Sequence, residues 1–142
     1  MIIIICGPSA AGKTTLANKM VSECVGSTLV DSDEVHHLLP KVDFSLEGRL
    51  VHVKNITKLL RTFYESNPIV FATFCLPILE MREIIRQELK DLPVLFWWLD
   101  TPIEVCIERD PKGLYRKQTP NMPGVDFPLE RPEPNEQATI VI

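Results

Sequence analysis

The segment from Gly7 to Thr14, GPSAAGKT, contains the residue types that hold a phosphate group. It fits the pattern GxxxxGK[ST], in which glycines let backbone N–H groups converge on phosphate oxygens. In that pattern the lysine reaches the β and γ phosphates of a nucleotide, and the next hydroxyl ligates Mg²⁺. The sequence therefore predicts a phosphate cradle in which Lys13 and Thr14 carry the chemistry. The alternative interpretation is a glycine-rich connection that binds nothing.

Such a cradle needs a strand before the loop and a helix after it. Short runs that are apolar on both faces predict buried strands at 2–6, 27–31, 68–74, 93–100 and 138–142. The amphipathic segments between them predict helices at 13–24, 46–65, 78–90 and 102–109. This alternation predicts an α/β fold in three layers, with a mostly parallel central sheet flanked by helices.

Composition limits the class of partner. The 142 residues suit one domain, 1–142, and a formal charge of -4 with dispersed lysines and arginines argues against binding of nucleic acid or an acidic membrane surface. A small molecule is therefore the expected partner. Four separated cysteines without a CxxC pair suit reduced core thiols in a cytoplasmic protein. The apolar start is too short for a signal peptide or a membrane span.

The segment 111–134 has a different texture from the rest of the chain. It contains six prolines and two glycines and shows little apolar periodicity. Long loops inside compact domains are often lids or binding loops, so we expect a lid here.

Candidate residues for the phosphate acceptor should follow the other strands, because α/β sheets bind ligands at the carboxyl ends of their strands. Asp31 and Asp33 come directly after the predicted strand 27–31. Two such carboxylates serve Mg²⁺ or orient an attacking hydroxyl, although one of them could instead cap a helix beginning near Glu34. His36 and His37 are nearby, and exposure or a neighbouring phosphate explains them better than a metal.

Five blocks of the sequence, taken in order, resemble the adenylylsulfate kinase family: GPSAAGKT, VDSDEVHH, FSLEGR, RDPKGLY and GVDFPLERPEPN. The likeness covers nearly the whole chain and is most specific in RDPKGLY. It implies the fold of P-loop nucleotide kinases with a mobile lid. It also implies transfer of the ATP γ-phosphate to the 3′-hydroxyl of adenosine 5′-phosphosulfate, giving 3′-phosphoadenosine 5′-phosphosulfate. Dimerisation is common in that family, so a homodimer is expected.

The resemblance also implies roles for individual residues. Asp33 and Lys13 are the implied catalytic residues, and Thr14 and Asp33 are the implied Mg²⁺ ligands. The implied ATP contacts are Gly7, Ser9, Ala10, Ala11, Gly12, Lys13, Thr14, Thr15 and Arg109. The implied acceptor contacts are Asp31, His36, Phe44, Arg49, His52, Lys112, Gly113, Leu114 and Met122.

Several positions depart from the family pattern, and they fall on the acceptor side. His36 stands where the family has an arginine, His52 where it has an asparagine, Leu76 where it has a serine, and Met122 where it has an aromatic residue. An imidazole that is mostly neutral at pH 7 does not replace a bidentate arginine on an anion. Two alternatives therefore stay open, namely a kinase for another nucleotide acceptor and a nucleotide-binding protein without turnover.

Three features favour structural roles. Trp97 and Trp98 lie in an apolar run and are expected in the core. Asp100 precedes Thr101-Pro102 and is expected to cap the helix 102–109. The Glu and Lys residues within 80–90 are expected on a solvated helix face.

Overall fold

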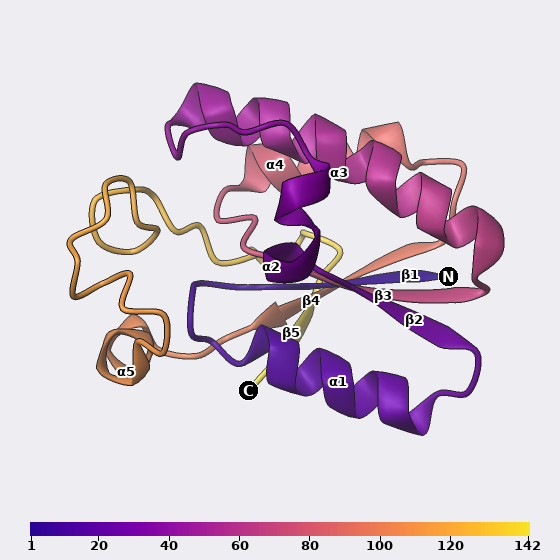
Figure 1. Ribbon diagram of the computed structural model, residues 1–142, viewed down its shortest axis with the longest axis horizontal. Helices are drawn as coiled ribbons and strands as arrows, with labels where there is room; N and C mark the ends of the chain where they lie inside the picture. The colour runs from indigo at the N-terminus through magenta and orange to yellow at the C-terminus, as the bar shows by residue number, and fades with distance from the viewer.

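The computed structural model describes residues 1–142 and contains one five-stranded sheet in the order β2-β3-β1-β4-β5 (Figure 1). Every pairing between neighbouring strands is parallel. The strands are β1 (Ile2–Cys6), β2 (Ser27–Asp31), β3 (Ile69–Phe74), β4 (Val94–Leu99) and β5 (Thr139–Val141). Each bound matches that of the predicted strand to within one residue. The predicted α/β fold is confirmed.

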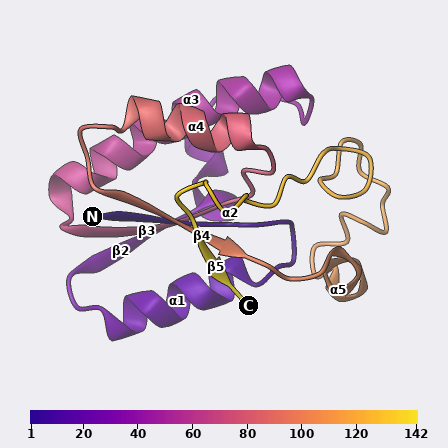
Figure 2. The same cartoon turned by 180° about the vertical axis from the view of Figure 1, so that it is seen from behind.

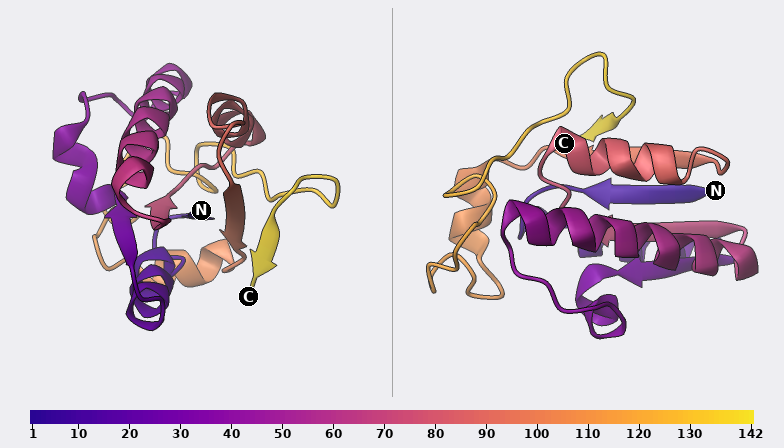
Figure 3. Two further views of the ribbon diagram at one scale, coloured as in Figure 1. Left: turned by 90° about the vertical axis from the view of Figure 1, so that its right-hand side faces the viewer. Right: turned by 90° about the horizontal axis from the view of Figure 1, so that it is seen from above.

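Helices cover both faces of this sheet. They are α1 (Lys13–Glu23), α2 (Ser32–Val35), the 3₁₀ turn η1 (His36–Leu38), α3 (Leu46–Ser66), α4 (Leu79–Glu88) and α5 (Ile103–Arg109). Figures 1 and 2 show α3 and α4 on one face and α1 on the other. Seen from above in Figure 3, α5 and the following loop lie beyond the carboxyl ends of the strands. The three predicted layers are therefore present.

The sequence of β1 explains why this strand is central. Ile2, Ile4 and Cys6 belong to the apolar cluster under α3 and α4, whereas Ile3 and Ile5 belong to the cluster that includes residues of α1 and α5. A strand buried on both faces has no polar alternation, which accounts for the uninterrupted run IIIIC. This strand leads directly into the phosphate loop and anchors it in the middle of the sheet.

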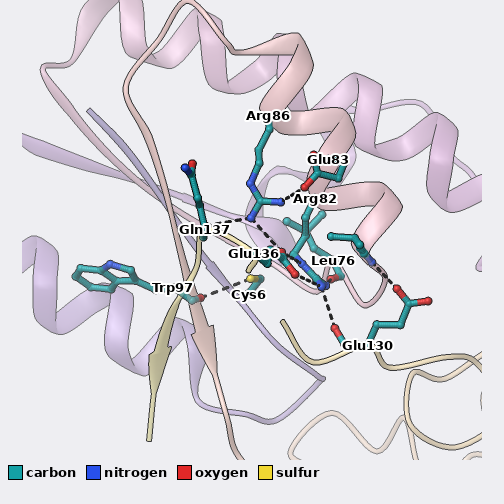
Figure 4. A network of polar contacts seen from close by, with 10 residues as sticks. Cys6, Leu76, Arg82, Glu83, Arg86, Trp97, Glu130, Glu136 and Gln137 are labelled. Atoms are coloured by element: carbon teal, nitrogen blue, oxygen red, sulfur yellow. Dashed lines mark hydrogen bonds and ion pairs between the residues drawn. The ribbon is translucent and has the colours of Figure 1, made fainter. Parts of the chain in front are cut away.

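Helix α4 carries a buried arginine that the sequence did not reveal. The Glu and Lys residues within 80–90 are exposed, as expected, but Arg82 is 0% exposed. The Arg82 side chain donates to both carboxylate oxygens of Glu136, at 2.6 and 2.9 Å, and to the carbonyl oxygens of Leu76 and Glu130, both at 3.0 Å (Figure 4). Its guanidinium also lies 5.2 Å from the centre of the Trp98 ring. Arg82 thus fastens the segment before β5 to the β3–α4 loop.

Two expectations about single residues need correction. Asp100 does not cap α5, because the helix begins after Pro102 without a side-chain cap and Asp100 instead accepts from Nε of Arg131 at 2.9 Å. All four cysteines are free thiols, but only Cys6 and Cys106 are buried; Cys24 and Cys75 are partly exposed. Burial raises the pKa of Cys6 to about 12, so that thiol stays protonated. Trp98 is buried and Trp97 half-buried, which agrees with a core role.

The loop 111–134 has no helix or strand of its own and contains a single isolated bridge between Pro123 and Phe127. The predicted long loop is therefore confirmed. None of the helices combines the length and the apolar composition that crossing a membrane requires.

Candidate active site

A cleft of about 960 Å³ lies at the carboxyl edge of the sheet, between the phosphate loop, the start of α3 and the loop 111–134. Thirteen of the predicted site residues line it: Ser9, Ala10, Gly12, Lys13, Thr14, Thr15, Asp33, Phe44, Arg49, Arg109, Lys112, Leu114 and Met122. The remaining predicted residues, which do not line it, are Gly7, Ala11, Asp31, His36, His52 and Gly113. The cleft therefore brings together residues of both predicted groups, those for ATP and those for the acceptor.

The backbone of the phosphate loop requires its two glycines. Gly7 has φ 149° and Gly12 has φ 101°, both in the region that side chains disfavour. A Cβ atom on Gly7 would also lie 3.0 Å from the carbonyl oxygen of Leu99, tighter than almost all real contacts. The spacing of the motif is thus explained by backbone geometry at the point where β1 turns into α1.

Lys13 begins α1 and folds back over the loop. Its Nζ donates to the carbonyl oxygens of Gly7, at 3.0 Å, and Pro8, at 2.7 Å. Burial lowers the pKa of Lys13 from its ordinary value. A partly buried ammonium group next to the positive end of a helix is an environment that favours an anionic ligand.

Side chains from outside the motif hold the carbonyl oxygens of the loop. The three contacts are Tyr115 Oη to the Ser9 oxygen (3.0 Å), Arg109 Nη1 to the Ala10 oxygen (3.4 Å) and Thr101 Oγ1 to the Ala11 oxygen (2.8 Å). Arg109 is exposed and its contact is long, whereas Tyr115 and Thr101 are partly buried. Carbonyls held in this way leave the N–H groups of the loop for a ligand.

Asp31, rather than Asp33, is the carboxylate beside Thr14. The Thr14 hydroxyl donates to Oδ2 of Asp31 at 2.6 Å, and the backbone N–H of Asp33 donates to Oδ1 at 2.9 Å. Burial opposes ionisation of Asp31, but these hydrogen bonds outweigh it and lower its pKa. Asp31 also caps α2, so the capping role predicted for one of the two aspartates falls on Asp31. Asp33 forms an ion pair with Lys112 in the cleft wall.

Arg49 lines the opposite wall together with Phe44, and it also packs against Phe127. Its guanidinium carbon lies 5.4 Å from the centre of the Phe44 ring and 4.5 Å from that of Phe127. Nε donates to the Phe44 carbonyl oxygen at 3.1 Å, and Nη2 donates to the Asn121 carbonyl oxygen at 2.7 Å. Burial lowers the pKa of Arg49, but arginine still carries its charge at neutral pH. This side chain joins the start of α3 to the loop 111–134.

The two histidines of the predicted acceptor site do not reach the cleft. His36 is exposed, and its Nδ1 lies 2.5 Å from the carbonyl oxygen of Asp33. His52 lies on α3, and its buried Nδ1 has no hydrogen-bond partner. Burial first, and then the charge of Arg49, lower the pKa of His52, so it is neutral at pH 7. Met122 does line the cleft and is only 5% exposed.

Sequence reasoning missed four residues that shape the site. Thr101 follows β4 at the carboxyl edge of the sheet, a position that could have suggested it. Tyr115 belongs to RDPKGLY, but nothing in the sequence indicates that its hydroxyl reaches the phosphate loop. Arg82 and Glu136 are charged residues far apart in the chain, and their burial was not predictable from helical periodicity. All four act through backbone groups or loops that border the cleft.

The protein-family model for adenylylsulphate kinase matches residues 1–140 of the chain. Among curated proteins, an adenylyl-sulfate kinase of Bacillus licheniformis is 35% identical over 95% of this chain and 73% of its own length. One of Bacillus pumilus is 35% identical over 92% of this chain and 71% of its own length. Among solved structures, the Mycobacterium tuberculosis APS kinase CysC in complex with AMPPNP and APS has a TM-score of 0.84 and 24% identity, covering 99% of this chain and 86% of that one. The chain belongs to the adenylylsulphate kinase family.

Proposed function

We propose that the protein transfers the γ-phosphate of ATP to the 3′-hydroxyl of adenosine 5′-phosphosulfate. The observation that carries this proposal is a single cleft that has the phosphate loop on one side and Asp33, Phe44 and Arg49 on the other. Family membership over residues 1–140 supports the same reaction. The matched curated relatives are named adenylyl-sulfate kinases.

On the donor side, the N–H groups of the phosphate loop and the ammonium of Lys13 hold the phosphates of ATP. Lys13 neutralises charge that develops on the transferred phosphoryl group, and its low exposure to water strengthens this interaction. The adenine and ribose of ATP then extend toward Arg109, at the rim of the cleft. Because this site is preformed by backbone geometry, little reorganisation is needed when ATP binds.

On the acceptor side, Asp33 orients the attacking hydroxyl and accepts its proton. Asp33 reaches the cleft wall, where Lys112 is its present partner. A hydroxyl donating to Asp33 competes with Lys112, which is then free to pair with a phosphate oxygen. Arg49 and Phe44 provide a charge and a ring face for the anionic and aromatic parts of the acceptor.

Mg²⁺ fits the donor set of this site. Thr14 and Asp31 place a hydroxyl and an ionised carboxylate oxygen 2.6 Å apart, and Mg²⁺ prefers oxygen ligands. We propose that Thr14 contributes a ligand, with Asp31 or Asp33 holding the ion directly or through water. When bound, the ion would neutralise negative charge on the phosphates.

The loop 111–134 acts as the lid of this cleft. Leu114, Met122 and Pro123 line its inner side, and closure over the ligands excludes water from the transferred group. We further propose that residues 1–142 act as one domain, assemble as a homodimer and work in the cytoplasm. Light scattering of the purified chain tests the dimer directly.

A kinase for a different nucleotide acceptor is the second candidate. It is favoured by Met122, which lines the cleft where the family has an aromatic ring and offers no ring face to a base. The position of His36 outside the cleft points the same way, since no group replaces the arginine of the family pattern there. A nucleotide-binding protein without turnover is the remaining alternative.

The test is product analysis by anion-exchange chromatography after incubation with ATP, Mg²⁺ and adenosine 5′-phosphosulfate. We expect 3′-phosphoadenosine 5′-phosphosulfate and ADP in equal amounts. Asp33→Asn should lower kcat by at least about 100-fold, the usual contribution of a general base. Asp91→Asn is the matched control, because Asp91 pairs with Arg61 on the exposed surface.

The possible results separate the candidates. Product from a different nucleotide, with none from adenosine 5′-phosphosulfate, would favour the second candidate. ATP binding without any product from a panel of nucleotides would favour the non-catalytic alternative. Unchanged turnover in Asp33→Asn would overturn the role given to that carboxylate.

A further inference from the structure

Several N–H groups of the phosphate loop have no partner within the protein, and two of them follow a carbonyl that is held by a side chain outside the motif. These two N–H groups belong to Ala10 and Gly12, and neither donates to any backbone or side-chain acceptor in the fold. The carbonyl oxygen of Ser9, which precedes Ala10, accepts from Tyr115 Oη at 3.0 Å. The carbonyl oxygen preceding Gly12 accepts from Thr101 Oγ1 at 2.8 Å.

Because the peptide group is planar, each of these contacts also fixes the direction of the N–H group that follows the carbonyl. In a trans peptide the C=O of one residue and the N–H of the next point in opposite directions. Fixing the carbonyl of Ser9 toward Tyr115 therefore aims the N–H of Ala10 away from Tyr115. Thr101 fixes the N–H of Gly12 in the same way. The N–H between them, on Ala11, is already used by the carbonyl of Pro8 at 3.2 Å.

We propose that Thr101 and Tyr115 are positioning residues for ATP, which aim the N–H groups of Gly12 and Ala10 at its phosphates. This inference deepens the proposed function and rests on its ATP site. It assigns a role to two residues that lie outside the GxxxxGK[ST] pattern. The hydroxyl groups act through the backbone of the loop and need no contact with the nucleotide.

Both side chains are held firmly enough to do this. Thr101 comes two residues after the end of β4, and β4 pairs with β1, the strand that leads into the loop. Tyr115 packs its ring against the apolar cluster beneath the sheet. Its own backbone N–H donates to Oδ1 of Asp110 at 3.2 Å, and Oδ2 of Asp110 accepts the N–H of Arg116 at 3.0 Å.

The position of Tyr115 adds a link between the lid and the cradle. Tyr115 lies in the first part of the loop 111–134, whereas the Ser9 carbonyl belongs to the phosphate loop. Any displacement of this part of the lid that breaks the contact releases the Ser9–Ala10 peptide. The hydrogen bond between Tyr115 and the Ser9 carbonyl therefore couples ATP binding to the position of the first part of the lid.

The experiment removes each hydroxyl and keeps the rest of the side chain. Dissociation constants for ATP are measured by isothermal titration calorimetry for Thr101→Val and Tyr115→Phe. We expect each variant to bind ATP about 5- to 10-fold more weakly, the effect of losing one neutral hydrogen bond of about 1 kcal/mol. Thr101→Ser restores the hydroxyl and should restore wild-type affinity.

Matched controls separate this role from a general loss of structure. Thr62 donates to the Lys58 carbonyl on the exposed side of α3, so Thr62→Val removes a similar hydrogen bond far from the cleft. Tyr64→Phe removes a tyrosine hydroxyl near the end of the same helix. Both controls should bind ATP like the wild type. Thermal unfolding without nucleotide should be close to wild type in Thr101→Val and Tyr115→Phe.

Wild-type ATP affinity in both Thr101→Val and Tyr115→Phe would overturn the inference. It would also be overturned if the loss of affinity were matched by a lowered unfolding temperature and Thr101→Ser did not restore binding, because that pattern describes a structural role. The readout is ATP binding and not turnover. A wild-type chain that binds ATP without phosphorylating adenosine 5′-phosphosulfate would therefore overturn the proposed acceptor alone.

Discussion

The donor and acceptor sides of the cleft are built in different ways. On the donor side, backbone groups of one short loop form the site, and this loop is fixed between the central strand β1 and helix α1. On the acceptor side, the groups are side chains such as Phe44 and Arg49, and Arg49 is held by the carbonyl of Asn121 in the lid. The donor side is thus continuous with the sheet, whereas the acceptor side depends on loops.

This difference explains where the sequence departs from its family. A backbone site depends on glycines at fixed positions, and the motif GxxxxGK[ST] is complete in this chain. A site made of side chains can differ at single positions, and the departures at His36, His52, Leu76 and Met122 all fall on the expected acceptor side. We therefore expect ATP binding and acceptor choice to be separable in this chain. Substitutions on the two sides should therefore have effects that differ in kind as well as in size.

The largest effect is expected on the donor side, from Lys13→Ala. Removing the ammonium leaves the developing phosphoryl charge without its nearest cation, so kcat/KM should fall by about 1,000-fold. Steady-state kinetics with coupled detection of ADP measures this. Lys58→Ala, an exposed residue on α3, is the control and should keep wild-type activity. A loss of less than tenfold in Lys13→Ala would show that the donor side does not depend on this loop as described.

The next largest effect is expected on stability, from the buried contacts that Arg82 makes with Glu136 and with the carbonyl oxygen of Leu76. Arg82→Met leaves the carboxylate of Glu136 buried with Arg86 as its only nearby cation, and it also removes the donor to the Leu76 carbonyl. Breaking one partner of a buried ion pair typically costs about 3–5 kcal/mol, so urea unfolding should show a loss of this order.

The double variant Arg82→Met/Glu136→Gln tests this mechanism. It removes the stranded charge and should recover part of the lost stability. Arg61→Met is the control, because the pair of Arg61 with Asp91 is exposed and screened by water, so its loss should change stability little. Equal losses for Arg61→Met and Arg82→Met would contradict the importance given to the buried network.

A smaller effect is expected on the acceptor side, from Arg49→Lys. Lysine keeps the charge but loses the planar fork that stacks between Phe44 and Phe127 and donates to the Asn121 carbonyl. The KM for the acceptor should rise about tenfold, the effect of about 1.4 kcal/mol, with the KM for ATP unchanged. Arg61→Lys is the matched control. A parallel rise in both KM values would show that the donor and acceptor sides of the cleft are not separable.

Features that depend on local sequence could be predicted, whereas contacts between distant segments could not. The strands, the main helices, the phosphate loop and the long loop 111–134 were predicted, because apolar periodicity and glycine spacing are local signals. The pairing of Thr14 with Asp31 was not, since it depends on how two segments meet in space. The roles of Tyr115 and Arg82 were also missed, because neither a tyrosine in a long loop nor an arginine in an amphipathic helix gives any sign of its distant partner.

The smallest effect concerns His52, which lies behind the acceptor side. Burial and the nearby charge of Arg49 lower its pKa in the folded protein, and its Nδ1 has no partner. Below the unfolded value of about 6.5, the unfolded chain binds a proton at this position that the folded chain does not. The free energy of unfolding therefore decreases as the pH falls below about 6.5, because proton uptake at His52 favours the unfolded chain.

His52→Asn removes this titrating group and introduces the residue of the family pattern. Between pH 7.5 and pH 5.5, the unfolding temperature of the wild type should fall by a few degrees more than that of the variant. His37→Asn, the same substitution at an exposed histidine, is the control. If His52→Asn and the wild type lost the same number of degrees, His52 would not be held neutral by its surroundings. A difference confined to His52→Asn would show that this departure from the family pattern carries a cost in stability as the pH falls.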